Sequence, residues 1–358
     1  MAKGTTYNHE RIEFVDARTG VRLMQVTSFP TMSMALPYYG RNFTGDSKTF
    51  LFISQREARR DAPWDLFRVD TDGTNLTQLT ECEGAAGFVM SPQDDCAYFH
   101  RQGALWRVDI NTFREEEILA PHGVASMGAG AISPDGLYYF AQVVTAHDTS
   151  GIVRIRTDGS EATLIAEEEQ GNLALHSASP GGTGLLVWQR REGKKTWLLL
   201  DDNGTERGVY TSSYDFAHCT FLGRSERVQG CALPPDRALV HIGFGEGQPT
   251  TIAQGAYFWH SASTLDGEWI VSDTNWPDEG LQLVHVPTGR YRPLCYPRSS
   301  QGHPQWTHPH PQFSPDGRMV LFNSDRTGIC QIYLAFIPDD LRERVRTGQL
   351  SVQERRVW

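Results

Sequence analysis

Short apolar runs separated by turn signals recur along the whole chain. Examples of these runs are Thr49–Ile53, Cys96–Phe99, Leu137–Phe140, Gly184–Trp188 and Trp269–Val271. Each follows a tetrapeptide related to Ser-Pro-Asp-Gly, with clear copies starting at Ser91, Ser133, Ser179 and Ser314, weaker copies at Thr44 and Thr264, and a degenerate copy near Phe221. About seven copies spaced roughly 40–50 residues apart have the period of propeller blades.

Further strands follow each copy and are joined by a second type of turn. Asp72-Gly73, Asp158-Gly159 and Asn203-Gly204 stand between segments of strand-like sequence. Asp-Gly and Asn-Gly in this setting are strong β-hairpin signals. We therefore expect each repeat to fold into a four-stranded antiparallel blade.

The two ends of the chain indicate how the ring closes. Residues 11–16 and 22–27 form a strand–turn–strand pattern with no Pro-Asp-Gly copy before it, and only two obvious strands follow the last copy. An N-terminal strand that completes the last blade would remove free sheet edges. We predict an all-β fold, a seven-bladed β-propeller closed by an N-terminal strand. Residues 1–358 form one domain in this prediction, with 339–358 a short helical tail on the outside.

Composition and charge exclude several classes of protein. The net charge of −10 argues against a nucleic-acid-binding protein, which needs a basic surface. The chain has no run long and apolar enough to cross a membrane, and its first residues do not resemble a signal peptide. The six cysteines are scattered without a Cys-x-x-Cys pair, which is typical of buried free thiols in a reducing compartment. We therefore expect a cytoplasmic protein with no nucleic-acid or membrane partner.

Several histidines precede a turn copy, which places them on or beside the innermost strand of a blade, where propellers bind ligands. His308 and His310 are two residues apart and point to one face if the segment is extended, and Gln305 lies just upstream. His260, His218 and His176 precede copies in the three preceding blades. Imidazoles and an amide oxygen that converge on the axis could bind a divalent metal.

Other common catalytic sites are absent from the sequence. It contains no Gly-x-Ser-x-Gly elbow, no paired carboxylates typical of glycoside hydrolysis and no glycine-rich phosphate loop. The histidines are thus the main candidates for chemistry.

The chain resembles the oligogalacturonate lyases, a family of seven-bladed propellers that degrade pectate, over most of its length in repeat order and most sharply over roughly the last hundred residues. The resemblance rests on Gln305-x-x-His308-x-His310-Pro-x-Phe-x-Pro-Asp and on His260 ahead of Asp266-Gly267. It implies that His260, Gln305, His308 and His310 bind a divalent ion of the Mn²⁺ type. It also implies that His218 is the catalytic base and that Lys195 stands where the family has an arginine.

Two departures from the family pattern bear on the substrate. The first blade has Met34–Asn42 where the family has a His-Arg-Asn stretch before an aromatic pair, so the histidine is missing. Lysine at position 195 cannot make the bidentate carboxylate contact of an arginine. The metal-binding positions therefore match the family pattern more closely than the substrate-binding positions do. A related uronate-containing oligosaccharide is the alternative substrate.

The residue types suit β-elimination from a uronate. The ion would neutralise the carboxylate on C5, and a neutral histidine can remove the C5 proton. We expect His218 to be this base, Lys195 or Arg41 to offer charge to a carboxylate, and His176 and Arg41 to contact the substrate. The predicted partner is a small acidic oligosaccharide.

Two other functions fit the same fold. A non-enzymatic scaffold similar to TolB would have no metal and would bind a protein on one face of the ring. A metal-dependent hydrolase or lactonase on a propeller usually uses carboxylate ligands, which are not evident around these histidines.

Overall fold

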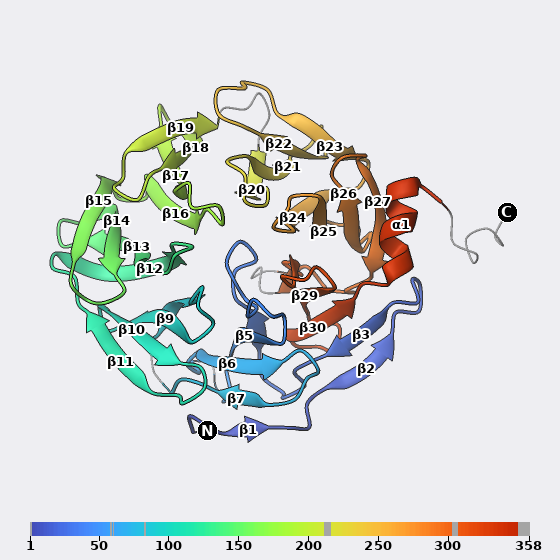
Figure 1. The fold of residues 1–358 in the computed structure, drawn as a ribbon, viewed down its shortest axis with the longest axis horizontal. Helices are drawn as coiled ribbons and strands as arrows, with labels where there is room; N and C mark the ends of the chain where they lie inside the picture. Colours follow the sequence, from blue (N-terminus) through green and yellow to red (C-terminus); the bar gives the residue numbers. More distant parts are fainter. Residues whose placement is uncertain are drawn as a thin grey trace.

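The computed structural model describes residues 2–57, 59, 61–81, 84–210, 216–302 and 307–349. Over these residues the strands form seven sheets arranged as blades around a central channel (Figure 1). This confirms the predicted all-β, seven-bladed propeller. Of the predicted helical tail, α1 spans Asp339–Thr347, and residues 350–358 lie outside the described residues.

Six blades follow one another along the chain, each with its innermost strand first. The first contains β4 Ser33–Ala35, β5 Thr49–Ser54, β6 Asp65–Asp70, β7 Leu76–Gln78 and, from the N-terminal end, β1 Thr6–Tyr7. The second contains β8 Ala86–Met90, β9 Cys96–Arg101, β10 Ala104–Asp109 and β11 Glu115–Leu119. The third contains β12 Val124–Ile132, β13 Tyr138–Thr145, β14 Thr149–Arg156 and β15 Ala162–Glu169.

The next three blades repeat this order. The fourth contains β16 Leu173–Ala178, β17 Leu185–Arg191, β18 Lys194–Leu200 and β19 Glu206–Tyr210. The fifth contains β20 Phe216–Phe221, β21 Val228–Ala232, β22 Ala238–Ile242 and β23 Thr250–Gln254. The sixth contains β24 Phe258–Ser263, β25 Trp269–Thr274, β26 Leu281–His285 and β27 Arg290–Cys295.

The seventh blade combines the two ends of the chain. Its inner strands are β28 Gln312–Phe313, β29 Met319–Ser324 and β30 Gln331–Phe336, and its outer strands are β3 Arg22–Gln25 and β2 Ile12–Val15. β3 pairs antiparallel with β30, with Leu23 opposite Ala335 and Gln25 opposite Tyr333. One sheet therefore holds both ends of the described chain together.

The Ser-Pro-Asp-Gly copies form equivalent turns between the innermost and second strands. In each blade the first turn residue donates its N–H to the carbonyl five residues later at 2.8–2.9 Å, from Thr44, Ser91, Ser133, Ser179, Leu222, Thr264 and Ser314. Ser133 illustrates the chemistry, because its Oγ bonds Asp135 Oδ1 and accepts the N–H of Tyr138, while Gly136 takes φ 75°. In this turn serine and aspartate supply side-chain hydrogen bonds, and glycine adopts a positive φ without strain.

The core lies between neighbouring blades. One cluster joins Trp269 and Val271 of the sixth blade to Phe322, Tyr333 and other residues of the seventh. Every residue of β25 is buried, because both faces of this middle strand are covered. Burying one large apolar side chain contributes about 1.5–3 kcal/mol, so packing between blades is the main stabilising term.

Three further features bear on the sequence predictions. α1 packs on the sixth blade through Leu341 and Val345, which are buried in the same cluster. No helix in the described part of the chain is long and apolar enough to span a membrane. The cysteines at 96, 219, 231, 295 and 330 are buried and form no disulfide, and Cys82 lies outside the described residues.

Candidate metal centre and active site

An insertion from the first blade enters the central channel. Ala35 pairs with Phe52 and Phe43 bridges to Phe50, so residues 36–42 stand opposite the single residue Leu51. We call residues 36–42 the channel loop; in Figure 1 the blue segment before β5 reaches into the middle of the ring. Its anchor is Gln312, whose side-chain amide donates to the carbonyls of Tyr38 and Gly40 and whose Oε1 accepts from Asn42.

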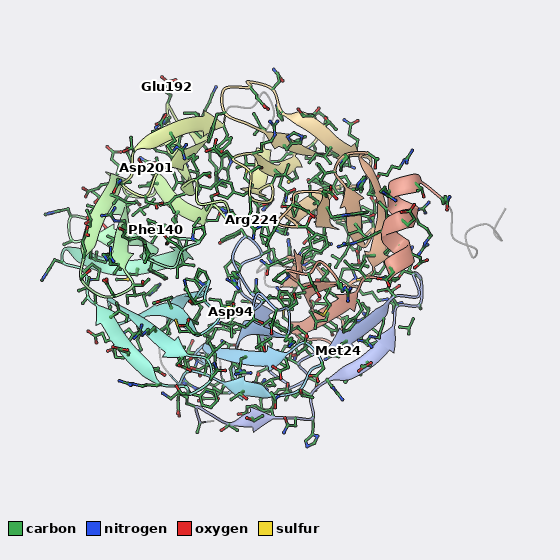
Figure 2. All side chains as sticks on the ribbon, viewed as in Figure 1. Met24, Asp94, Phe140, Glu192, Asp201 and Arg224 are labelled. Carbon is green, nitrogen blue, oxygen red and sulfur yellow. The ribbon has the colours of Figure 1, made fainter. Side chains whose placement is uncertain are left out.

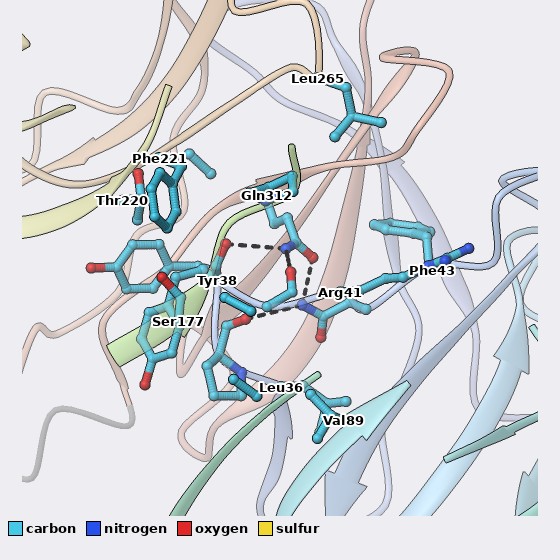
Figure 3. Close-up of a pocket in the computed structure, with 18 of the residues that line it drawn as sticks. Leu36, Tyr38, Arg41, Phe43, Val89, Ser177, Thr220, Phe221, Leu265 and Gln312 are labelled. Atoms are coloured by element: carbon cyan, nitrogen blue, oxygen red, sulfur yellow. Dashed lines mark hydrogen bonds between the residues drawn. The ribbon is translucent and has the colours of Figure 1, made fainter. Parts of the chain in front are cut away.

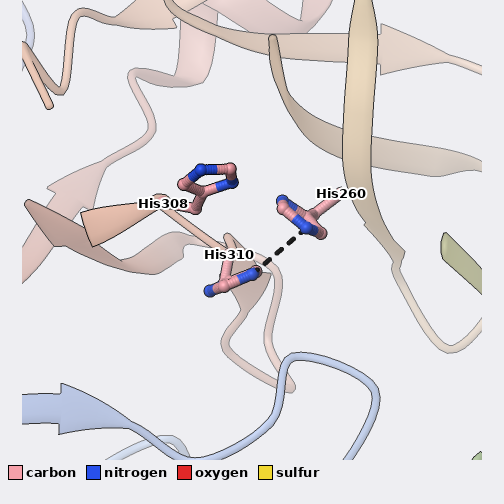
Figure 4. A group of neighbouring side chains, drawn as sticks. All are labelled: His260, His308 and His310. Carbon is pink, nitrogen blue, oxygen red and sulfur yellow. Dashed lines mark hydrogen bonds between the residues drawn. The ribbon is translucent and has the colours of Figure 1, made fainter. Parts of the chain in front are cut away.

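Three histidines meet beside the channel loop (Figure 4). The possible ligand atoms of His260, His308 and His310 all lie within 4.8 Å of one another. Nε2 of His260 is 3.2 Å from Nε2 of His310. The ring of Tyr38 stacks in parallel on His310, with 5.5 Å between ring centroids, and covers this side of the cluster.

The backbone conformation that brings the histidines together differs from the expected one. We expected an extended segment in which positions 308 and 310 share a face. In the structure β28 begins only at Gln312, and His310 has a left-handed backbone with φ 46°. Asp273 supports this conformation, because its Oδ2 accepts the backbone N–H of His310 at 3.2 Å.

Asp273 also orients His260, and sequence reasoning missed it. It is buried on β25, and its two oxygens accept the backbone N–H of His260 at 2.6 Å and the Nδ1–H at 2.9 Å. This tautomer leaves the lone pair of His260 on Nε2, which faces His310. No turn or histidine motif includes position 273, so the sequence carried no signal for it.

The cluster fits a divalent cation. Burial lowers the pKa values of His260 and His310 well below 6.5, so both rings are neutral and can donate lone pairs at neutral pH. Nitrogen ligands at about 2.1 Å from one ion stand roughly 3–4 Å apart, which the His260–His310 separation matches. Gln305, the predicted fourth ligand, lies outside the described residues.

His218 stands next to this cluster on the innermost strand of the fifth blade. Its ring centroid is 4.4 Å from that of His260 and 4.5 Å from that of Trp259. The register of β20 shifts between Ala217 and Thr220, and His218 has φ 55°. Burial, together with the neighbouring His260, lowers the pKa of His218 to about 3, so the ring is neutral at neutral pH.

Lys195 and His176 come from the fourth blade. The Lys195 ammonium lies 4.5 Å from the ring centre of Trp197 and 5.1 Å from that of Trp188, and partial burial there lowers its pKa. His176 packs on Tyr39 of the channel loop with 4.1 Å between ring centroids. Burial lowers the pKa of His176 to about 3, with further lowering by Lys195 and His218. Both residues therefore lie close enough to His218 for their charges to affect one another's pKa.

Arg41 is placed elsewhere. Its guanidinium pairs with Asp94 and donates to the carbonyls of Pro92 at 2.8 Å and Phe43 at 3.0 Å. These partners belong to the turn of the second blade and the end of the channel loop, and Figure 2 shows Asp94 near the central opening. The structure does not bring Arg41 to the histidine cluster, and its contacts favour anchoring the channel loop.

A cavity of about 460 Å³ occupies the turn end of the channel. Tyr38, Arg41, Phe221, Leu265 and Gln312 are among its lining residues (Figure 3). Its described lining also includes one turn residue from every blade, namely Gly45, Pro92, Pro134, Pro180, Gly223, Leu265 and Pro315. His176 borders it, whereas His218, His260, His308 and His310 do not. Tyr38 therefore contacts both features, because it lines the cavity and stacks on His310.

Comparisons with known proteins agree with this fold. A family model described as Pectate_lyase22, oligogalacturonate lyase, matches residues 1–135. A curated oligogalacturonate lyase of Dickeya dadantii is 25% identical over an alignment that covers 95% of this chain and all of the relative. The chain is thus similar to an oligogalacturonate lyase over nearly its whole length. The resemblance inferred from the sequence is thereby confirmed, and the family model matches the first two blades and the innermost strand of the third.

Further oligogalacturonate lyases match over similar lengths. The oligogalacturonide lyase of Pectobacterium atrosepticum is 24% identical and is covered completely by 95% of this chain. A solved oligogalacturonate lyase in complex with manganese has a TM-score of 0.81 at 23% identity, with 96% of this chain and all of that chain covered. The oligogalacturonate lyase of Vibrio parahaemolyticus has a TM-score of 0.80 at 18% identity, with 95% and 100% covered. These two structures support the fold.

Proposed function

We propose that this protein is a metal-dependent lyase that cleaves short oligogalacturonides, or a related uronate-containing oligosaccharide, by β-elimination. The observation that carries the proposal is the buried cluster of His260, His308 and His310, oriented by Asp273 and flanked by His218. The full-length similarity to oligogalacturonate lyases selects the uronate substrate from among the reactions that such a cluster could support.

In this proposal His260, His308 and His310 hold a divalent cation, with Gln305 as a fourth ligand. Manganese is the first ion to test, because one related structure is a manganese complex. When bound, the ion supplies positive charge to the C5 carboxylate of the substrate and thereby makes the C5 proton more acidic.

His218 is the proposed base. Its neutral ring has a free lone pair at neutral pH, and it lies beside His260. A pKa of about 3 makes it a weak base in the protein alone, and a uronate carboxylate bound beside it would favour the protonated ring. The proton on C5 passes to this ring, and the electrons of the C5–H bond form the C4–C5 double bond. The C4–O bond breaks, its electron pair stays on the oxygen of the departing sugar, and this oxygen takes a proton from solvent water.

Lys195 is proposed to bind a substrate carboxylate. Its ammonium carries no salt bridge within the described residues and rests on two indole rings, so it remains available to an anion. His176, wedged between Tyr39 and Trp197, would form the wall behind it. The buried reduced cysteines support a location in the cytoplasm, where such thiols persist.

The first experiment measures the metal content of the purified protein and the ultraviolet absorbance of unsaturated uronate product formed from oligogalacturonides, with and without added Mn²⁺. His218→Ala should keep the metal and lose at least about a hundredfold in turnover, because proton transfer is removed. His260→Ala should lose the metal as well. The exposed His122 provides a matched control, and His122→Ala should behave as the wild type.

Bound metal without turnover of any oligogalacturonide would reject this substrate and direct the search to other uronates. Absence of both metal and turnover would reject the lyase and leave a binding scaffold. Full activity in His218→Ala would reject His218 as the base.

A further inference from the structure

A row of aromatic rings leads away from the candidate base along the rim of the channel. Trp259 packs on His218, and Tyr257 packs on Trp259 with 5.6 Å between ring centroids and an interplanar angle of 84°. Both rings are only partly buried. The row therefore offers apolar surface next to the proposed reaction centre.

A cation stands at the far end of this row. The guanidinium of Arg237 lies 4.9 Å from the centre of the Tyr257 ring. Arg237 is exposed at the end of the hairpin between β21 and β22, and no carboxylate pairs with it among the described residues. The protein as a whole has a net charge of −10, so an arginine without a carboxylate partner is a local positive charge that attracts an anionic ligand.

The row lies at the same end of the channel as His218. Phe216 at the start of β20 pairs with Ala232 at the end of β21, which places the Arg237 hairpin at the end of the blade opposite to the turn. Asn275 donates its N–H to the carbonyl of Tyr257, so the β25–β26 connection borders the row. The next residue of that connection, Trp276, is 72% exposed. Four groups suited to an acidic sugar thus share one rim.

Partly exposed aromatic rings pack on the apolar faces of ligands, and arginine binds carboxylates with paired, charge-assisted hydrogen bonds. Along the row the Trp259 ring centre lies 4.5 Å from that of His218, the Tyr257 ring centre lies 5.6 Å from that of Trp259, and the Arg237 guanidinium lies 4.9 Å from the Tyr257 ring centre. Two aromatic rings followed by one cation match a single uronate residue, which has an apolar ring face and one carboxylate.

We propose that Trp259, Tyr257 and Arg237 form a subsite for an additional uronate residue of the substrate, with its carboxylate on Arg237. This proposal rests on the proposed function, and it makes the protein prefer oligouronides longer than a dimer. Trp276 extends the same surface.

The test compares kcat/KM for the galacturonate trimer with that for the dimer in the metal-loaded protein. In Arg237→Ala the trimer-to-dimer ratio should fall about tenfold or more, because a hydrogen bond to a charged group is lost. Arg237→Lys should restore part of the ratio. Arg224→Ala is the matched control, because Arg224 is an exposed arginine of the same blade, lies in the turn after β20 and should leave the ratio unchanged.

An unchanged ratio in Arg237→Ala, or an equal fall in Arg224→Ala, would overturn the subsite. Calorimetric binding of trimer and dimer to metal-loaded His218→Ala separates this result from the reaction itself. A preference for the trimer that depends on Arg237 supports the subsite even if no oligogalacturonide is cleaved, in which case only the lyase proposal fails. Equal binding of trimer and dimer overturns the subsite.

Discussion

Asp273 forms hydrogen bonds to two of the three clustered histidines and thereby fixes their conformation. One oxygen accepts the backbone N–H of His260, and the other accepts both the His260 Nδ1–H and the backbone N–H of His310. Burial raises the pKa of Asp273, while His310 and the backbone N–H groups of His260 and His310 oppose that rise. A carboxylate behind a ligating histidine fixes its ring and its tautomer, so Asp273 would support the proposed metal centre through hydrogen bonds to His260 and His310.

Asp273→Asn should weaken metal binding about 10- to 100-fold, because an amide cannot accept all three hydrogen bonds. The measurement is a metal titration against a competing chelator, with circular dichroism to show that the fold is kept. Asp278→Asn removes a carboxylate from the next loop that accepts backbone N–H groups of Gly280 and Arg298 and does not bond the histidines. Equal metal affinity in both variants would contradict this role of Asp273.

His176 should make stability depend on pH. Its pKa is about 3 in the folded protein, against an ordinary value of 6.5. Between these values the unfolded chain binds a proton that the folded protein does not bind, so the free energy of unfolding rises with pH in this window. From about pH 7 to about pH 5 the wild type should lose about 2 kcal/mol that His176→Gln does not lose. Urea unfolding of both proteins at the two pH values checks this, and identical pH slopes would contradict it.

The innermost strands are the elements that build the site. With the seven turns aligned by their shared hydrogen bond, His218, His260 and His310 all lie four residues before the first turn residue, whereas His176 lies three before it. The strand register is irregular at His176, His218 and His260, between Leu175 and Ser177, Ala217 and Thr220, and Phe258 and Ser261. Bulges redirect side chains, so one irregular step repeated in successive blades brings the imidazoles together.

Much of the blade architecture and part of the site could be predicted from these repeats. The period gave the seven blades, and the shared offset gave His218, His260 and His310, because both depend on local turn chemistry. Asp273 and Tyr38 reach the site from a second strand and from a channel insertion, and neither has a local signal. The anchoring of Arg41 to Asp94 likewise depends on contacts between blades, so sequence could not separate it from a substrate-binding role.

Arg56 connects the N-terminal segment to the first blade. Its side chain is 2% exposed and bonds Glu10 at 2.5 Å, and its guanidinium lies 4.9 Å from the ring of Tyr7, 5.1 Å from Phe29 and 4.9 Å from Phe67. Arg56→Ala should lower the free energy of unfolding by about 3–5 kcal/mol, because it removes a buried guanidinium from three aromatic rings and leaves the largely buried Glu10 carboxylate without its charged partner. Urea unfolding measures this change.

The control for Arg56 is Arg107→Ala. Arg107 pairs with Glu116, and both side chains are largely exposed at 41% and 46%, so its loss should cost less than about 1 kcal/mol. Equal costs for the two variants would mean that the buried pair does not anchor the segment.

At the scale of the whole molecule, the ring is held by the blade that joins the two ends of the chain. Deleting residues 2–26 removes β2 and β3 and uncovers β30, whose Tyr333 and Leu334 are fully buried. We expect this deletion to abolish soluble expression or bound metal, because His308 and His310 precede the inner strand of the same blade. Deleting residues 2–8 removes only β1 and should keep the metal, as measured by elemental analysis. A soluble, metal-bound protein without residues 2–26 would contradict this dependence.

The shared blade also orders events during synthesis. β2 and β3 are synthesised near the start of the chain. Their neighbour in the sheet, β30, is absent until the segment through Phe336 has emerged from the ribosome. His260 leaves the ribosome well before His308 and His310, and the three can meet only when the last blade assembles. A nascent chain that stops before Phe336 therefore has no closed ring, and its proposed metal ligands are not yet assembled. If the proposed metal centre is correct, ion binding would report that translation has passed the final strand.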